Sequence, residues 1–256
     1  MSTYRVNTSN YISRAIVTLL ICLTISLVTF AQEPNTISTP TPIPETNLIK
    51  NVIKDQVAIF SKPITIKKDD IKVIVPFASA TLLSLAFDKK INKNLNKSSS
   101  FLKNSRNISA IGSAYATFGT AGAFYLVGKL SGNAKSKETG LLGLEALVDS
   151  TIVFNVIKAV TRRERPNKNF GKGDFFADGG NSFPSGHATL AWTMATVVAK
   201  KYSDKPIVKF ASYGLATLVS ITRVTGQKHF PTDVLVGSVI GYLIGHYVVK
   251  RHSTHP

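Results

Sequence analysis

The amino-acid sequence predicts an all-α fold, a bundle of about six core helices in a single domain. Apolar residues recur along several segments of helical length, and polar residues or prolines bound these segments. No segment has the regular apolar and polar alternation of a half-buried strand. The 256 residues are sufficient for a real hydrophobic core. The core helices are expected at residues 71–87, 108–127, 140–157, 186–201, 207–222 and 232–250.

The N-terminus has the layout of a secretory signal peptide. A polar start that carries Arg5 and Arg14 precedes an apolar run over residues 15–30, and the small Ala31 follows. This order predicts a signal peptide over residues 1–31 that is cleaved on export. An uncleaved membrane anchor is the alternative, although the apolar run is short for a span.

A linker and a short helix follow the signal peptide. Residues 32–47 are rich in proline and threonine and have nothing to bury, so they predict a disordered or extended linker. The folded domain is expected to begin near Leu48, where helical spacing of apolar residues predicts a short amphipathic helix before Pro63. The single cysteine, Cys22, lies in the signal peptide, so no disulfide is expected within the mature chain.

The first core helices differ in composition. Asp69 and Asp70 precede residues 71–87 and are suited to cap a helix there. The lysine-rich segment 89–106 is interpreted as a solvated connection, and contact with lipid headgroups is the alternative. Residues 108–127 carry no charge and are rich in small residues, which indicates a closely packed central helix.

The later helices carry the C-terminal half of the domain. Residues 140–157 are apolar except for two carboxylates and deliver Lys158 at their end. The last helix carries Gly237, Gly241 and Gly245 at intervals of four. Such a stripe lets a neighbouring helix approach closely, and it occurs both in membrane helices and in tightly packed soluble bundles.

A formal net charge of +17 indicates anionic partners: nucleic acid, an anionic membrane surface or a phosphorylated substrate. Nucleic acid is the least favoured of these. The sequence has no helix-turn-helix, zinc-ligand or RNA-stacking signature, and its basic residues are scattered. No metal site is expected either, because there is no HExxH pattern and no cysteine pair.

The first of three chemically notable clusters lies in the run IKAVTRRERP. Lys158 and Arg165 are seven residues apart, so on a helix they would share one face two turns apart and point into one pocket. Pro166 would then end that helix. Arg162 and Arg163 would fall elsewhere and are interpreted as solvated charges.

The second cluster is Pro184-Ser185-Gly186-His187. Ser185 is a suitable N-cap, and Gly186 and His187 would open the next helix. Free backbone N–H groups and the positive end of the helix dipole make such a point an anion site, where a phosphoryl oxygen would fit.

The third cluster is Arg223, His229 and Asp233. Because proline is favoured at the first helical position, Pro231 predicts that the last helix starts just after His229. Asp233 would lie in its first turn, where the carboxylate can accept a hydrogen bond from one ring nitrogen and leave the other free to attack phosphorus. Arg223 can add a bidentate grip on a phosphate.

These clusters form the pattern K-x6-R-P, P-S-G-H and R-x5-H-x3-D. The pattern resembles the signature of the type 2 phosphatidic acid phosphatase (PAP2) and vanadium haloperoxidase superfamily, of which this chain looks like a bacterial exported member. By this resemblance, residues 48–256 form one PAP2-like phosphatase domain. One departure is Thr222, where the family usually has serine, and the hydroxyl is kept.

The resemblance implies a metal-independent phosphatase that works without a cofactor through a phosphohistidine. By motif position, His229 is the nucleophile, Asp233 orients it, and His187 is the general acid that protonates the leaving alcohol. The remaining motif residues are expected to hold the phosphoryl oxygens as charge develops. They are Lys158, Arg165, Arg223, Ser185 and the amide of Gly186.

The substrate is expected to be a phosphate monoester or diphosphate, of a lipid such as phosphatidate or an isoprenoid diphosphate. Aromatic residues before the second cluster could line an approach for a lipid tail, or could pack on their own core. Alternatives are an acid phosphatase for small soluble esters, a vanadate-dependent haloperoxidase, for which vanadate would be cofactor rather than inhibitor, and a non-enzymatic basic binding module. The aromatic residues are Phe170, Phe175, Phe176 and Phe183.

The expected location is the bacterial cell envelope, in the periplasm. If the signal is cleaved and six helices then span a membrane, the clusters fall on the cytoplasmic side, against the outward-facing site that the resemblance implies. Lysines and arginines show no bias between the two sides. The sequence therefore favours a domain that is soluble or lies against a membrane. An integral membrane protein with an uncleaved first segment and an outward-facing site is the alternative.

Overall fold

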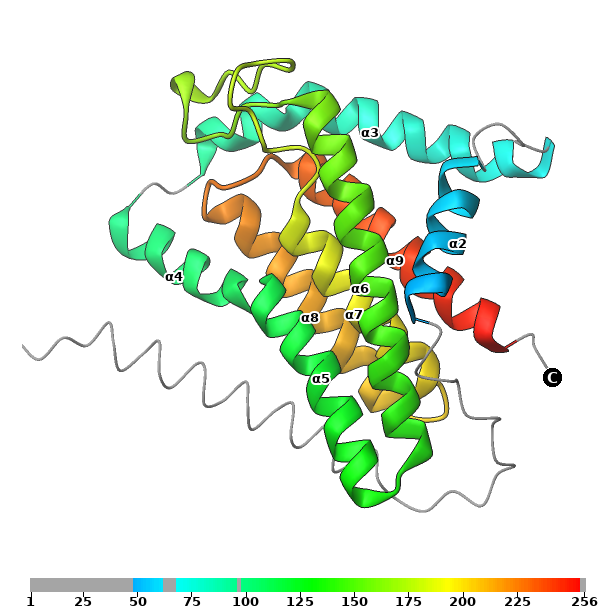
Figure 1. Cartoon of the computed structure of the whole chain (residues 1–256). Coiled ribbons are helices and arrows are strands. Elements are labelled where there is room, and N and C mark those ends of the chain that lie inside the picture. Colours follow the sequence, from blue (N-terminus) through cyan, green and yellow to red (C-terminus); the bar gives the residue numbers. More distant parts are fainter. Residues whose placement is uncertain (1–47, 62–67, 96–97, 254–256) are drawn as a thin grey trace, which may run out of the picture.

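The computed structural model describes residues 48–61, 68–95 and 98–253 (Figure 1). The signal peptide predicted for residues 1–31 and the linker predicted for residues 32–47 lie outside this part of the chain. Within the described residues every regular element is a helix, so the predicted all-α fold is confirmed. The elements are α2 (Leu48–Ser61), α3 (Lys68–Asn94), α4 (Ser99–Ser109), η3 (Ala110–Gly112), α5 (Ala114–Ser131), α6 (Ala134–Thr161), η4 (Asn169–Gly171), α7 (Gly186–Lys201), α8 (Pro206–Thr225) and α9 (Pro231–Ser253).

α7 is the central helix of the bundle and packs against α6, α8 and α9. Most of its side chains are buried. The predicted glycine stripe of α9 faces it: a Cβ added at Gly245 would lie 2.8 Å from the Thr193 carbonyl oxygen, and Gly237 and Gly241 meet the α7 backbone as closely. The prediction that this stripe permits close approach of a neighbouring helix is therefore confirmed.

The single helix predicted for residues 108–127 is wrong, because the chain breaks at Ser113. The backbone of Ser113 is extended, with ψ of 157°, and its side chain accepts a hydrogen bond from the Ala116 N–H. Serine competes in this way for backbone groups and so starts a new helix. α4 and the short η3 precede this break and α5 follows it, and α5 then pairs with α6 as a long hairpin (Figure 1).

The segment predicted as a solvated connection is also helical in large part. α3 continues to Asn94, and α4 begins at Ser99. Lys89, Lys90 and Lys93 are exposed on α3 as expected for solvated charges. The opposite face of α3 is buried but polar, so the sequence has no apolar periodicity there that would predict a helix. α3 crosses the end of the bundle where the loop between α6 and α7 lies (Figure 1).

α2 confirms the short helix predicted from Leu48, but it turns its polar side toward the protein. Asn51 donates a hydrogen bond to Glu145 of α6 at 3.2 Å, and Gln56 donates to the Asp149 carboxylate at 2.7 Å. The large apolar side chains of α2 are instead exposed, which is the reverse of a helix packed on a soluble core. They are Ile49, Ile53, Val57 and Phe60.

Arg251 of α9 completes the charged contact between α2 and the bundle. It donates hydrogen bonds to the Asp55 carboxylate and, at 2.7 Å, to the Glu145 carboxylate. Asp55 is fully buried and Glu145 nearly so. Ion pairs thus hold α2 in place where apolar packing would be usual.

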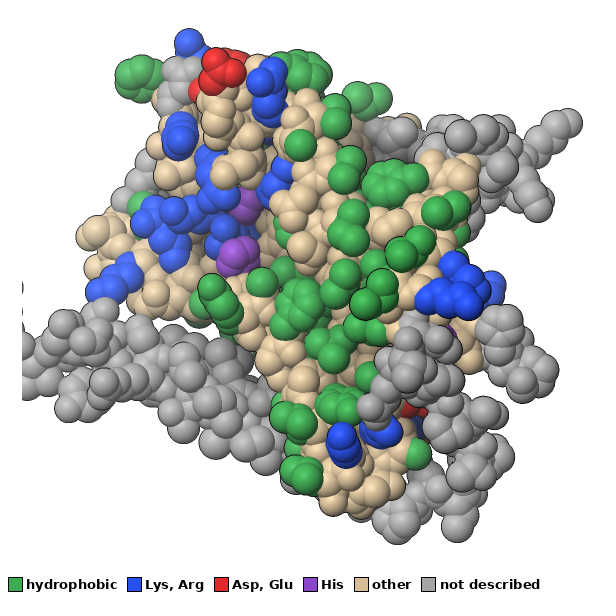
Figure 2. Space-filling model, in the orientation of Figure 1, with side chains coloured by type: hydrophobic (Ala, Val, Ile, Leu, Met, Phe, Trp, Pro, Cys, Tyr) green, Lys and Arg blue, Asp and Glu red, His purple; other side chains and the backbone are tan. Residues whose placement is uncertain are grey.

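Three of the described helices, α6, α8 and α9, are long and apolar enough to cross a membrane, judged by length and composition. Apolar side chains are also widely exposed over the face shown in Figure 2. Apolar side chains that gather on an exposed surface are typical of contact sites for proteins or membranes.

Candidate active site

The first cluster does not lie on one helix. α6 ends at Thr161, and Arg162 has the left-handed conformation with φ of 40°. The predicted shared helical face of Lys158 and Arg165 is therefore wrong. The helix stops because the loop before α7 supplies other donors for its last carbonyls: the Phe176 N–H bonds to the Thr161 oxygen, at 2.9 Å.

Lys158 and Arg165 nevertheless meet at the same loop residue. Lys158 Nζ donates hydrogen bonds to the carbonyl oxygens of Asn181, at 2.9 Å, and Pro184, at 2.6 Å. Arg165 Nε donates to Asn181 Oδ1 at 2.8 Å. The loop thus brings together the two cations that the sequence reasoning assigned to one helical face.

The second cluster has the predicted geometry. Ser185 is the N-cap of α7, which begins at Gly186, and its side chain accepts a hydrogen bond from the Ala188 N–H. The Ser185 N–H donates to the Asp233 carbonyl oxygen at 2.9 Å, which joins the starts of α7 and α9. The first amides of α7 and His187 therefore lie beside the third cluster.

The third cluster spans the end of α8 and the start of α9. Arg223 lies on the last turn of α8, is buried, and donates to Ser109 Oγ at 3.0 Å. α9 begins at Pro231, as predicted, with Asp233 in its first turn. The Asp233 carboxylate accepts from the Phe230 N–H at 2.9 Å, the reciprocal half of a capping box.

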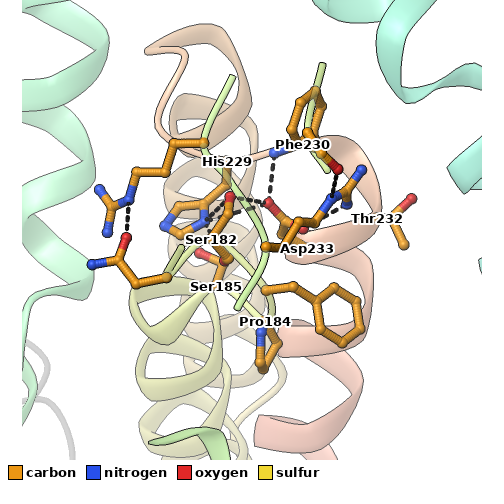
Figure 3. Close-up of polar contacts among 12 residues, drawn as sticks. Ser182, Pro184, Ser185, His229, Phe230, Thr232 and Asp233 are labelled. Atoms are coloured by element: carbon orange, nitrogen blue, oxygen red, sulfur yellow. Dashed lines mark hydrogen bonds and ion pairs between the residues drawn. The ribbon is translucent and has the colours of Figure 1, made fainter. Parts of the chain in front are cut away.

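His229 has a closer partner than the predicted one. Its Nδ1 is 2.8 Å from the Ser182 carbonyl oxygen and 3.6 Å from Asp233 Oδ2. Ser182 Oγ donates to Asp233 Oδ2 at 2.5 Å, so Ser182 lies between the two (Figure 3). Because a carbonyl can only accept, Nδ1 carries the proton of the neutral ring and Nε2 keeps a free lone pair. Sequence reasoning missed Ser182, whose position just before Phe183-Pro184 was the only signal.

The side chains of Arg162 and Arg163 lie in opposite environments, one exposed and one buried. Arg162 is exposed and lies 3.6 Å from the exposed Asp178, as predicted for a solvated charge. The same prediction for Arg163 is wrong, since its side chain is buried between the carboxylates of Asp88 and Asp233. The reason is the left-handed turn at Arg162, which directs the next residue inward. Asp88 was also missed, because no motif marks it.

Cations surround the histidines at this end of the bundle, and Figure 2 shows Lys and Arg side chains gathered around them. Burial and then the nearby Arg223 charge lower the pKa of His187 to about 3. Burial lowers the pKa of His229 to about 4, although the Asp233 carboxylate acts in the opposite direction. Both rings are therefore neutral at pH 7, and the site carries an excess of positive charge suited to an anion with several oxygens.

No group of three or more His, Cys, Asp or Glu side chains among the described residues is arranged to hold a metal ion. The carboxylates near His229 are engaged by other side chains: Asp233 by Arg163 and Ser182, and Asp88 by Arg163. Positive charge at the site comes from lysine and arginine.

Comparisons with known proteins find relatives of the part of the chain that holds the three clusters. The family model of the PAP2 superfamily matches residues 139–255. Lipid A 1-phosphatase of Porphyromonas gingivalis is 36% identical over 66 residues, which cover 25% of this chain and 15% of that relative.

Two crystal structures resemble the fold. The transmembrane PAP2 type phosphatidylglycerolphosphate phosphatase from Bacillus subtilis matches with a TM-score of 0.56 and 23% identity, over 71% of this chain and 96% of that chain. Aquifex aeolicus LpxE matches with a TM-score of 0.49 and 25% identity, over 66% of this chain and 95% of that chain. The Bacillus structure has the same helical fold. The PAP2 superfamily model matches residues 139–255, which hold all three clusters, so this part of the chain is similar to that superfamily.

Proposed function

We propose that this protein is a phosphatase that hydrolyses a phosphate monoester or diphosphate of a lipid, without a metal ion, through a phosphohistidine. The observation that carries the proposal is the state of His229: Nδ1 donates to the Ser182 carbonyl, so the lone pair of Nε2 is available as a nucleophile. A neutral imidazole surrounded by lysine and arginine is suited to attack the phosphorus of a bound anion.

In the first step, Nε2 of His229 attacks phosphorus, an N–P bond forms, and the ester P–O bond breaks. The leaving alkoxide takes a proton from His187 and departs as the alcohol. Lys158 and Arg165 neutralise the charge that develops on the phosphoryl oxygens, and they are joined by Arg223, the Ser185 hydroxyl and the Gly186 amide.

In the second step, His187 accepts a proton from a water molecule that attacks the phosphohistidine. The N–P bond breaks, inorganic phosphate leaves, and His229 returns to its neutral form. His187 must be protonated for the first step, and its pKa of about 3 concerns the site without an anion. A bound phosphate dianion offsets the surrounding positive charge and raises that pKa toward neutrality.

A lipid is the favoured substrate class for two reasons. The relatives described above are named as phosphatases of lipid A and of phosphatidylglycerolphosphate. In addition, Phe170 and Phe176 of the loop before α7 project into solvent, with relative exposures of 103% and 68%. Phe175 packs against Phe183, so this loop joins an exposed aromatic edge to the second cluster.

We also propose that the protein is associated with a membrane of the bacterial cell envelope. α6, α8 and α9 are long and apolar enough to span, and the outward apolar face of α2 suits contact with acyl chains. Export to the periplasm through a signal peptide over residues 1–31 remains part of this proposal.

A substrate panel tests the function. Phosphatidate, an isoprenoid diphosphate, phosphatidylglycerophosphate and p-nitrophenyl phosphate are assayed with the purified full chain, with EDTA and with orthovanadate. We expect release of phosphate from a lipid, unchanged by EDTA and inhibited by orthovanadate. His229→Ala should abolish it, whereas His246→Ala, a histidine outside the site, should not. Loss of activity in EDTA, or activity confined to p-nitrophenyl phosphate, would refute the proposal.

A further inference from the structure

A carboxylate from α3 reaches the end of the bundle that holds the candidate site. Asp88 is fully buried, and its Oδ1 accepts from the Thr232 backbone N–H at 3.0 Å and from the Thr232 hydroxyl at 2.9 Å. Its Oδ2 accepts from Arg163 Nη2 at 2.8 Å. Asp88 therefore binds both the first turn of α9 and one arm of the Arg163 guanidinium.

The guanidinium of Arg163 is held on every side. Nη1 donates to Asp233 Oδ1 at 2.7 Å, and Nε donates to the Gly173 carbonyl oxygen at 3.2 Å. The group also lies against the rings of Phe230, at 4.2 Å, and Phe175, at 4.8 Å. A planar fork with partners in three directions has one orientation, so it can fix the position of a carboxylate.

Arg163 forms hydrogen bonds with both residues that lie next to His229 Nδ1, Asp233 and Ser182. Its side chain holds Asp233, whose other oxygen accepts from Ser182 Oγ. Its backbone carbonyl accepts from the Ser182 N–H at 2.8 Å. The Ser182 carbonyl in turn accepts the hydrogen bond from Nδ1. Two chains of hydrogen bonds therefore connect Arg163 with the imidazole ring. One runs through the Arg163 side chain and the other through its backbone carbonyl.

We infer that Arg163 and Asp88 are positioning residues, which fix the His229 ring in the orientation and tautomer needed for attack on phosphorus. The inference rests on the proposed function. A misplacement of about 1 Å at the reacting atoms can cost about 100-fold in rate, so rigid support of the ring has a large effect. Buried ion pairs contribute little net stability compared with apolar packing, so the inference rests on the rigid geometry of this pair beside His229.

Asp88→Asn tests the inference, because it removes the charge with little change in shape. The matched control is Asp55→Asn: Asp55 is also fully buried and paired with an arginine, but it lies at the contact of α2 with α9. Both variants are assayed below their unfolding midpoints. We expect Asp88→Asn to lower kcat about 100-fold with KM changed by less than about twofold. Asp55→Asn should keep kcat within about twofold of the wild type.

A second variant separates geometry from charge. Arg163→Lys keeps the positive charge but cannot bridge the carboxylates of Asp88 and Asp233 at once. It should show the same selective loss of kcat as Asp88→Asn. Full activity of this variant would overturn the inference, since charge alone would then suffice.

Nitrogen NMR of the full chain with labelled histidine gives a readout that does not need turnover. In the wild type at pH 7, His229 should show one tautomer with Nδ1 protonated, and Asp88→Asn should add the second tautomer. If the wild type hydrolyses no phosphate ester, the proposed function is wrong and the NMR comparison alone decides the inference. An unchanged tautomer in Asp88→Asn, with kcat equal to that of Asp55→Asn where activity exists, overturns it.

Discussion

At the scale of the residue, the proposed chemistry depends on which nitrogen of His229 holds the proton. The Ser182 carbonyl fixes Nδ1 as the donor, and the Asp233 carboxylate lies beyond it at 3.6 Å. The carboxylate is close enough to stabilise positive charge on the ring after attack. Asp233 thus acts on His229 through charge and through Ser182, more than through a direct hydrogen bond.

The low histidine pKa values make the folded protein sensitive to acid. His229, with a folded pKa of about 4 against an ordinary value of 6.5, binds a proton in the unfolded chain before it does so in the folded one. Because the unfolded state then holds more protons, stability falls as the pH drops from about 6.5 toward 4. Thermal unfolding midpoints across this range should decrease, and they should decrease less in His229→Gln. Equal slopes in the variant and the wild type would contradict this origin.

The pH dependence of activity should also reflect the protonation of His229. The nucleophile must be unprotonated, so protonation of His229 should give the pH profile an acid limb centred near its folded pKa of about 4. Measurements must stay where the fold is intact. An acid limb centred near 6.5 would mean that His229 is not buried as the structure describes.

The sequence identified the motif residues, but not the residues that hold them in position. Ser185, Asp233 and Pro231 act through neighbours a few residues away, so local capping rules could place them. Arg163 and Asp88 are 75 residues apart in sequence and meet only in the folded chain. No local pattern distinguishes Arg163 from Arg162, since one left-handed residue decides which side chain is buried.

At the scale of the element, the contact of α9 with α7 sets the distance between the second and third clusters. The glycine stripe lets the two helices approach until the Ser185 N–H bonds to the Asp233 carbonyl.

The accuracy of the predicted helix bounds depended on whether local sequence signals mark the ends of each helix. α7 and α9 were predicted closely because N-cap and proline signals mark their starts, whereas α3 was predicted too short because its buried face is polar near Asp88 and Asn92.

Gly241→Ala tests this contact. Its Cβ would overlap with the Thr189 carbonyl of α7, so the helices must separate, and we expect a loss of about 1–3 kcal/mol in the free energy of unfolding. The matched control is Gly214→Ala on α8, where an added Cβ meets nothing within 4 Å. That change should stabilise by about 0.5–1 kcal/mol through helix propensity. Denaturant unfolding of both variants measures the difference, and equal effects would contradict the close packing.

At the scale of the whole molecule, positive charge and apolar surface have separate locations. Cations gather at the end of the bundle that holds the site, while apolar side chains cover much of the face below it (Figure 2). The sequence favoured a soluble or peripheral domain because six spans would put the clusters on the cytoplasmic side, and because lysines and arginines show no bias between the two sides. That reasoning treats the charged residues as solvated. Several of these charges, such as Glu145 and Arg251, pair inside the structure. Composition alone could not separate an internal charge from a solvated one.

Membrane association predicts the behaviour of the chain on fractionation. A chain that starts at residue 32, without the first apolar run, should stay in the membrane pellet after a carbonate wash, because the apolar faces of α2, α6 and α8 remain. A soluble periplasmic marker in the same preparation serves as control. Complete release of the chain into the supernatant would show that these helices are covered within a soluble protein.

The direct test of the central claim is to trap the phosphorylated protein. The full chain is mixed with substrate, quenched in alkali during turnover to preserve phosphohistidine, and mapped by mass spectrometry, with His187→Gln used to slow the second step. The account predicts phosphate on Nε2 of His229 and none in His229→Ala. With p-nitrophenyl phosphate, whose leaving group needs no general acid, His187→Gln should accumulate more of it than the wild type. Turnover with no phosphate on His229, or with phosphate on another residue, would contradict it.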